Sequence, residues 1–221
     1  MYEESRITVE VVSVIVCFIL LRYMIKPFWL TREVRYLGLP LGFGFLGISY
    51  AISATAYTGL FHFFELFWIQ FLARTFAFVF LAVTYYFSKK TSKKTRTLWD
   101  VTFSLLIISL ITLLIVAFIF PQTASDSYTT SQIYVRVFNV ICLSYIAIHT
   151  LRSHVKKLDA TTIWVPLGYI LLAVSQYSLL FWYNDNSLAA FTGSLVLRLM
   201  ALAVFLVVSY RSFHEWKRTE V

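Results

Sequence analysis

Charged side chains are scarce in this sequence, and long apolar runs take their place. Only 14% of the 221 residues are Asp, Glu, Lys or Arg, whereas 59% are hydrophobic, and the mean hydropathy is +0.75. A soluble domain of this length cannot bury that much apolar surface, so lipid must serve as the solvent for much of the chain. The composition predicts an integral membrane protein.

Cysteine, histidine and lysine are nearly absent from the apolar runs, which excludes several kinds of chemistry. Cys17 and Cys142 both lie in apolar runs and form no disulfide framework. No run contains a lysine before its last residue, which excludes a retinal Schiff base within a span, and the histidines lie at or beyond the ends of the runs. The His, Cys, Asp and Glu residues show no spacing typical of metal ligands. The sequence also has no paired carboxylates and no serine-hydrolase motif. We therefore expect no metal, no cofactor and no enzymatic activity.

Seven apolar runs are long enough to cross a membrane as helices, since a bilayer core of about 30 Å needs about 20 helical residues. The runs are 7–26, 37–58, 62–87, 99–120, 132–151, 162–183 and 187–211. The first follows the acidic segment MYEESR and precedes no small-residue cleavage site, so we expect a retained helix. The sequence predicts an all-α protein in the cell membrane, with residues 1–221 forming one seven-helix transmembrane domain.

Basic residues gather in alternate connections between the runs. Fifteen of the nineteen Lys and Arg residues lie in the first, third and fifth connections and in the C-terminal tail. Cytoplasmic loops carry such an excess of positive charge, so we expect the N-terminus outside and the C-terminus in the cytoplasm. The net charge of +8 is explained by basic residues that set the membrane topology and attract anionic membrane lipids. The charge therefore does not support nucleic-acid binding.

The first three runs and the last three share a sequence pattern. LPLGFGFLGISY at 39–50 aligns with VPLGYILLAVSQ at 165–176, and LARTFAFVFLAVTYY at 72–86 aligns with VLRLMALAVFLVVSY at 196–210. The offset is 126 for the first pair and 124 for the second, and the two cysteines extend the pattern at an offset of 125. We expect tandem three-helix repeats, one over about 7–88 and one over about 132–211, joined by a linker helix at about 99–120.

Two arginines, Arg74 and Arg198, fall near the centres of predicted spans. Each costs about 2.5–3.5 kcal/mol on insertion scales, so neither is expected to face lipid. Glu10 and Glu65 lie near the outer ends of their spans, so we expect no acidic partner at the depth of either arginine. Arg136 lies near an outer end too, and it can form an ion pair with Glu10 or Glu65. The other predicted polar-core residues are Ser49, Gln70, Ser175, Gln176 and Ser194.

Three interpretations of the two central arginines stay open. Each guanidinium can bond neighbouring hydroxyl, amide and backbone oxygens and hold its three-helix half together. Alternatively, the two can face a central cavity and bind an anionic ligand or a lipid headgroup. In the third interpretation, each binds a carboxylate of a partner protein in the membrane.

Two resemblances bear on function. The predicted 3+1+3 layout with the N-terminus outside is similar to the SWEET/PQ-loop sugar transporters, although the spans at 7–26 and 132–151 lack the proline of that family's Pro-Gln signature. GYILLAVSQYSLL followed by LVLRLMALAVFLVVSYR resembles the seven-helix sensor modules of prokaryotic and archaeal histidine kinases, over the second, third, sixth and seventh spans. The second resemblance implies a sensor role, whereas the first implies transport.

These observations favour a non-catalytic membrane module, sensor-like or an accessory subunit, that packs against a protein partner. One alternative is a small-solute transporter with its site between the two halves. Another is a lipid-binding membrane protein. The expected partners are membrane lipids and a membrane protein, a homo-oligomer stays open, and no nucleic acid is expected.

Overall fold

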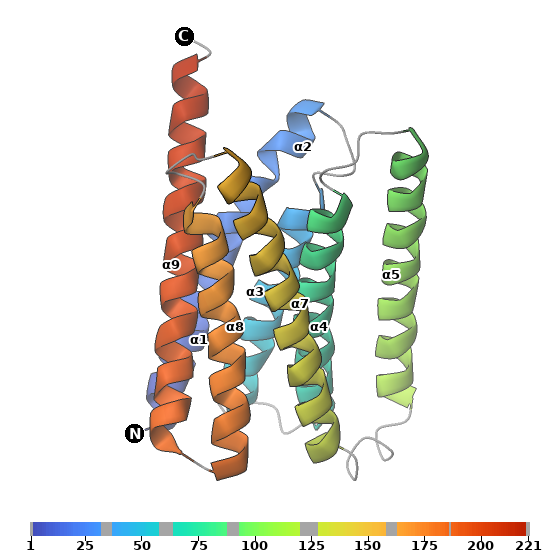
Figure 1. Ribbon diagram of the computed structural model, residues 1–221. Helices are drawn as coiled ribbons and strands as arrows, with labels where there is room; N and C mark the ends of the chain where they lie inside the picture. The colour runs from blue at the N-terminus through green and yellow to red at the C-terminus, as the bar shows by residue number, and fades with distance from the viewer. Residues whose placement is uncertain are drawn as a thin grey trace.

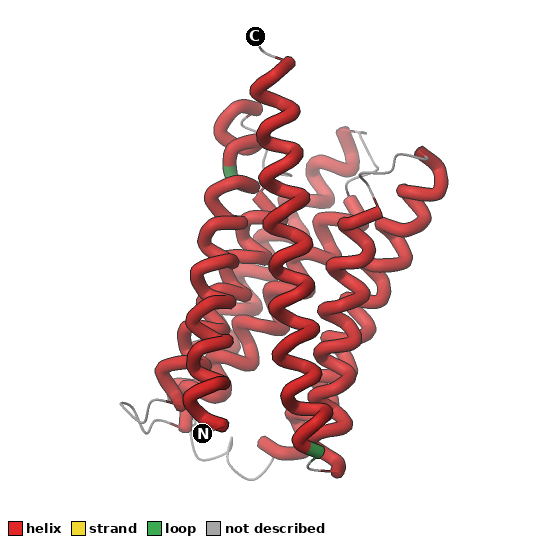
Figure 2. Tube along the Cα trace, turned by 90° about the vertical axis from the view of Figure 1, so that its left-hand side faces the viewer, coloured by secondary structure: helices red, strands yellow, loops and turns green. Residues whose placement is uncertain are grey.

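The computed structural model of the chain is helical almost throughout the residues that it describes, 2–31, 37–57, 64–87, 93–119, 128–157, 163–185 and 187–219 (Figures 1 and 2). The helices are α1 (Tyr2–Met24), α2 (Lys26–Thr31), α3 (Gly38–Tyr57), α4 (Phe64–Phe87), α5 (Lys93–Ile119), α7 (Tyr128–Lys157), α8 (Trp164–Asp185) and α9 (Leu188–Thr219). The prediction of an all-α protein is confirmed.

Seven stretches of helix in this part of the chain are long and apolar enough to cross a membrane. They are Glu4–Trp29, Gly38–Ala56, Trp68–Phe87, Thr97–Val116, Gln132–Val155, Trp164–Trp182 and Leu188–Ser212. Each coincides with one of the seven predicted runs, because length and composition alone determine where a chain can span lipid. The prediction of seven membrane-spanning helices is confirmed at this level.

The first span consists of α1 and α2, with a break between them close to Pro27. Proline has no N–H to donate, and its ring crowds the carbonyl four residues earlier, so a helix bends or breaks there. The amide of Ile25 still bonds the carbonyl of Leu21 at 3.0 Å, and the amide of Trp29 bonds the carbonyl of Ile25 at 3.2 Å. The chain therefore continues in the same direction, with α2 prolonging α1 (Figure 1).

Threonine hydroxyls within the helices bond back to the preceding turn. Each donates to the carbonyl four residues earlier, at 2.6–3.0 Å. In an apolar medium this bond satisfies the hydroxyl without help from another helix. Exposed helix faces can therefore carry threonine, as Thr112 and Thr192 do.

Six of the long helices form a closed ring within the described residues. In order around the ring, α1 contacts α3, α3 contacts α4, α4 contacts α7, α7 contacts α8, α8 contacts α9, and α9 contacts α1. Helix α5 lies outside the ring, at the edge of the bundle, and packs against α4 (Figure 1). Aromatic pairs make that contact, with ring centroids 5.6 Å apart for Phe80 and Phe103 and also for Phe87 and Trp99.

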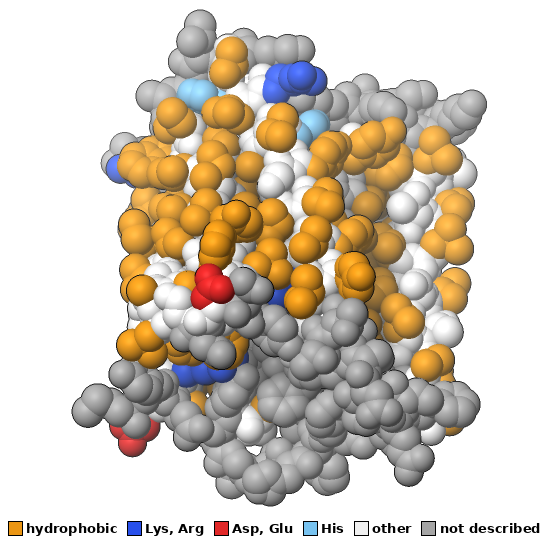
Figure 3. Space-filling model, turned by 60° about the horizontal axis from the view of Figure 1, so that its bottom comes forward, with side chains coloured by type: hydrophobic (Ala, Val, Ile, Leu, Met, Phe, Trp, Pro, Cys, Tyr) orange, Lys and Arg blue, Asp and Glu red, His pale blue; other side chains and the backbone are white. Residues whose placement is uncertain are grey.

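The interior of the ring is filled by large apolar and aromatic side chains. The Phe205 ring of α9 lies between the ring of Tyr169 on α8, 4.7 Å away, and that of Phe43 on α3, 5.3 Å away. All three residues are almost fully buried. Hydrophobic side chains also cover most of the described outer surface, as Figure 3 shows. An apolar exterior this extensive is expected where lipid covers the protein.

Helices α8 and α9 approach each other closely at Gly168. A Cβ atom at this position would lie 2.7 Å from two carbon atoms of the Phe205 ring. That ring is enclosed by Tyr169 and Phe43 and cannot move aside without displacing them. Glycine is therefore required at position 168 by packing.

Gly168→Ala should lower the melting temperature of the protein, because overpacking a filled core costs about 1–3 kcal/mol. Gly193→Ala is the matched control, since nothing lies within 4 Å of a Cβ added there and alanine favours helix over glycine. The control should melt at the wild-type temperature or slightly above it. Circular dichroism of the purified variants in a mild detergent measures both, and equal melting temperatures would contradict the prediction.

Candidate functional site

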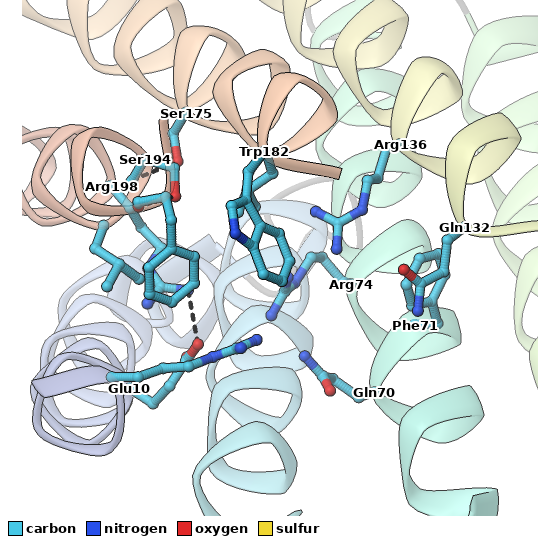
Figure 4. Close-up of a pocket in the computed structure, with 14 residues that line it drawn as sticks. Glu10, Gln70, Phe71, Arg74, Gln132, Arg136, Ser175, Trp182, Ser194 and Arg198 are labelled. Atoms are coloured by element: carbon cyan, nitrogen blue, oxygen red, sulfur yellow. Dashed lines mark hydrogen bonds and ion pairs between the residues drawn. The ribbon is translucent and has the colours of Figure 1, made fainter. Parts of the chain in front are cut away.

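A cavity of about 250 Å³ lies inside the ring, near the end of the bundle where α1, α4, α7 and α9 begin (Figure 4). Among the described residues, four arginines and one carboxylate line it: Arg6, Arg74, Arg136, Arg198 and Glu10. Uncharged polar side chains add further hydrogen-bonding groups: Gln70, Gln132, Ser175 and Ser194. The arginines make this cavity strongly positive.

Arg198 forms a buried ion pair with Glu10. Its Nη1 atom donates to Oε1 of Glu10 at 3.0 Å, and the two residues are 3% and 2% exposed. The expectation that neither central arginine has an acidic partner is therefore wrong for Arg198. Counting residues from the span ends placed Arg198 and Glu10 at different depths in the membrane. That count ignores the lean of a helical side chain toward the N-terminus of its helix. This lean carries the Arg198 guanidinium toward the end of the bundle where Glu10 lies.

Arg74 occupies a different environment, in which no carboxylate of the described residues forms an ion pair with it. Its Nε atom donates to Oγ of Ser49 at 3.2 Å, and that hydroxyl donates to the carbonyl of Gln70 at 3.1 Å. Arg74 is 9% exposed, and its Nη2 atom is buried without a hydrogen-bond partner among the described residues. Burying a guanidinium with an unused N–H donor costs free energy. Such a group is suited to bind an anion, which can accept that hydrogen bond.

Tyr50 lies between the two central arginines. The centre of its ring is 5.2 Å from Cζ of Arg74 and 4.6 Å from Cζ of Arg198. A cation held against an aromatic face is stabilised by about 2 kcal/mol or more when water is excluded. The tyrosine therefore offsets part of the cost of burying both guanidinium groups.

Arg136 was expected to pair with Glu10 or Glu65. The carboxylate of Glu10 bonds Arg198, and the side chain of Glu65 lies outside the described residues. Cζ of Arg136 is 5.9 Å from the centre of the Phe71 ring. The arginine lines the cavity from α7, next to Arg74 of α4 (Figure 4).

All seven predicted polar-core residues are buried, with at most 9% of their surface exposed: Arg74, Arg198, Ser49, Gln70, Ser175, Gln176 and Ser194. Five of them line the cavity. Ser49 lies behind Arg74, and Gln176 lines a smaller hollow that also includes Arg74. The structure thus brings these residues together around one space.

Sequence reasoning missed the lining residues Arg6 and Gln132, and it missed the Tyr50 ring between the two central arginines. A signal for the first two was present, because Arg6 precedes Glu10 by four residues and Gln132 precedes Arg136 by four. Residues four apart share a helix face, so each pair points to the same side. No comparable signal marks Tyr50 among the many aromatic residues of the chain.

Ser49→Ala should destabilise the protein more than Ser175→Ala. Ser175 donates to the carbonyl of Ser194 at 2.8 Å, a bond that typically contributes about 0.6 kcal/mol between membrane helices. Ser49 makes the same kind of bond but also accepts from Arg74, so its loss leaves a buried charge without its acceptor, at about 1–3 kcal/mol. Thermal melts of the two variants test this, and an equal loss would show that the Arg74 bond contributes nothing.

No protein-family model matches the chain, and no curated protein or solved structure matches it. Within the described residues, no group of three or more His, Cys, Asp and Glu side chains could hold a metal ion. The chemistry of the site follows from its own side chains. A small cavity lined by four guanidinium groups, of which those of Arg74 and Arg198 are buried, is suited to bind an anion.

Proposed function

We propose that this protein is a non-catalytic, sensor-like module of the cell membrane that binds a small anion in its interior. The charge of the described cavity lining carries this proposal: among the described residues, four arginines against one glutamate give a formal charge of +3 around a volume of about 250 Å³. Arginine binds carboxylate and phosphate groups through several N–H donors at once. The volume equals that of roughly eight water molecules at about 30 Å³ each, which suits a small metabolite.

The burial of the arginines favours a small ligand over the side chain of a partner protein. Arg74 and Arg198 lie inside the ring of helices, whereas another membrane helix can contact only its outer faces. Those faces carry exposed aliphatic residues such as Ile108 and Ile148. The proposed protein partner contacts the outer faces of the bundle, where it would respond to anion binding in the cavity.

The proposal includes tandem repeats, with α1, α3 and α4 in one half and α7, α8 and α9 in the other. Equivalent pairs of helices are in contact. The contact of α3 with α4 corresponds to that of α8 with α9, and the contact of α1 with α9 corresponds to that of α7 with α4. The bond from the Ser49 hydroxyl to the Gln70 carbonyl has its counterpart between Ser175 and Ser194. The offsets are 126 and 124 residues, as in the sequence alignment.

Close approaches between helices support the same relation. A Cβ at Gly42 of α3 would lie 2.6 Å from Leu81 of α4, as a Cβ at Gly168 of α8 would lie 2.7 Å from Phe205 of α9. The two glycines are 126 positions apart, and Leu81 and Phe205 are 124 positions apart. Equal contacts at equal spacings support tandem repeats over a chance similarity of apolar helices.

Burial determines the register between α1 and α7. The inward-facing residues Ser13, Cys17 and Leu20 are 0% exposed, and the residues 126 positions later, Asn139, Leu143 and Ile146, are at most 2% exposed. The offset of 125 suggested by the two cysteines would instead pair buried Leu20 with Tyr145, which is 39% exposed. An offset of 126 therefore describes this helix pair better.

The predicted topology places the cavity on the outer side of the membrane. On the cytoplasmic side of the cavity, the interior is filled by the Phe43, Tyr169 and Phe205 cluster and by the Tyr169 and Tyr85 hydroxyls, 3.3 Å apart. A ligand entering from outside would thus reach a closed end, which favours detection over passage. Transport is the second candidate, because sites at the seam between repeats are typical of transporters.

Thermal stability of the purified chain in lipid nanodiscs tests anion binding. Addition of acetate, glycolate, phosphate or sulfate at constant ionic strength should raise the melting temperature for at least one anion. The expected stabilisation is about 2.7 kcal/mol at 100 times Kd. Uptake of the stabilising anion into liposomes that contain only this chain would favour transport over sensing. If no anion stabilises the protein, the proposed function is wrong.

Arg74→Gln should weaken anion binding by more than ten-fold and leave the ligand-free protein about as stable as the wild type. The substitution removes a buried charge that lacks a carboxylate partner, so folding loses little. Arg211→Gln is the matched control, since Arg211 is exposed near the other end of α9. The control should bind the anion like the wild type, and equal binding by Arg74→Gln would contradict the prediction.

A further inference from the structure

The inward faces of α8 and α9 change from polar to apolar along the cavity. On α8, Ser175, Leu179 and Trp182 lie on one helix face and all line the cavity. On α9, Phe191 precedes Arg198 by about two helical turns, and both line the cavity as well. The cavity therefore has a polar part deeper in the bundle and an apolar part near the ends of α8 and α9 that the chain connects.

Two aromatic rings dominate the apolar part. The ring centroids of Trp182 and Phe191 are 5.1 Å apart, Phe191 is 8% exposed, and Trp182 points into the cavity (Figure 4). Aromatic residues at the ends of membrane helices usually anchor the protein at the lipid interface. The neighbouring Phe181 fits that role, since it is 48% exposed. Trp182 and Phe191 instead face the cavity, where they can contact a ligand.

The polar part contains N–H donors without acceptors. Among the described residues, Nη2 of Arg74 is buried without a hydrogen-bond partner, and so are Nε and Nη2 of Arg198. Glu10 accepts from Nη1 of Arg198 and leaves these atoms unbonded. The Cζ atoms of both arginines lie within 5.2 Å of the centre of the Tyr50 ring, so the unused donors gather in one region. A carboxylate can accept several such hydrogen bonds.

We propose that the ligand is a small aromatic carboxylic acid, with its carboxylate at Arg74 and Arg198 and its ring against Trp182 and Phe191. This inference rests on the proposed anion binding and names the ligand class. A cavity of about 150 Å³ can hold a benzene molecule, so the cavity of about 250 Å³ has room for a ring and a carboxylate. An inorganic anion would fill only the polar part and leave water against the apolar wall, which is unfavourable.

Four related compounds test the ligand class on the unaltered protein in lipid nanodiscs. Benzoate should bind at least about 30-fold more tightly than acetate, since each buried carbon contributes about four-fold in affinity. It should bind about two- to ten-fold more tightly than cyclohexanecarboxylate, which has the same charge and carbon count but cannot stack on Trp182. Benzamide has the shape of benzoate without its charge, and should bind at least about ten-fold more weakly. Ligand-dependent melting temperatures measure these affinities.

Trp182→Leu tests the position of the ring. It removes the stacking surface and keeps an apolar side chain, so the affinity for benzoate relative to that for acetate should fall at least about three-fold. Phe181→Leu is the matched control, because this neighbouring ring is exposed. It should bind both acids like the wild type. Equal affinity ratios in the two variants would overturn the inference.

The results also separate this inference from the proposed anion binding. If acetate, phosphate or sulfate stabilises the protein and benzoate binds no more tightly than acetate, the ligand class is wrong and anion binding stands. Cyclohexanecarboxylate or benzamide binding as tightly as benzoate would likewise overturn the ligand class. Failure of every anion, including benzoate, to stabilise the wild type would overturn both.

Discussion

Glu10→Gln should lower the melting temperature of this protein by roughly 6–20 °C. The substitution removes the carboxylate charge that bonds Arg198, a residue that is 3% exposed. Breaking a buried ion pair from one side costs about 3–5 kcal/mol, because the remaining charge stays desolvated and uncompensated. For a chain of about 220 residues, each kcal/mol corresponds to about 2–4 °C. Thermal melts in detergent or nanodiscs measure the shift.

The matched control for this prediction is Glu4→Gln, which makes the same chemical change on an exposed residue of the same helix. It should shift the melting temperature by less than about 2 °C, as most surface substitutions do. Arg198→Gln should cost as much as Glu10→Gln, because it leaves the carboxylate unpaired. If Glu10→Gln melts like Glu4→Gln, the ion pair does not hold α1 to α9.

A charge reversal at Glu10 should be rescued by the opposite reversal at Arg136. Glu10→Arg alone places a guanidinium against Arg198, so a buried like-charge contact replaces the ion pair and little folded protein should be recovered. In the double variant E10R/R136E, the new carboxylate at position 136 faces Arg74. The double variant then exchanges the two charges between positions that the proposed offset of 126 makes equivalent, and it keeps the net charge of the cavity lining. It should fold and melt within a few degrees of the wild type.

The control for this exchange is E10R/R152E, which has the same net charge but carries the new carboxylate on the exposed part of α7. It should be recovered as poorly as Glu10→Arg alone. The yield of monodisperse protein and its melting temperature measure the rescue. Equal behaviour of the two double variants would mean that positions 10 and 136 are not equivalent, and the proposed repeat register would be wrong.

These predictions assign different roles to two arginines that look alike in the sequence. Arg198 holds α9 to α1 through Glu10, which agrees with the interpretation of a structural lock, although the partner is a carboxylate. Arg74 has a neutral acceptor in Ser49 and a buried free donor, which agrees with the interpretation of a ligand site.

The sequence by itself determined the class of structure. Apolar runs of about 20 residues can only be helices in lipid, because an unpaired backbone N–H or C=O there costs several kcal/mol. Their number and approximate ends are therefore local properties. The burial of Arg74 and Arg198 was also predictable, since a guanidinium facing acyl chains is too costly. The same reasoning selected Ser49 and Ser175 as inward-facing polar residues.

Only the tertiary structure decided which charges meet. The chain places Glu10 and Arg198 188 residues apart, and their contact depends on α1 and α9 closing the ring. It also depends on the lean of a long side chain toward the start of its helix, so counting residues from the span ends assigned the wrong depths. The position of Tyr50 between two guanidinium groups and the cavity beside Arg136 likewise arise from helix packing. Packing depends on which helix surfaces come into contact, and the sequence pattern of a single helix does not specify that.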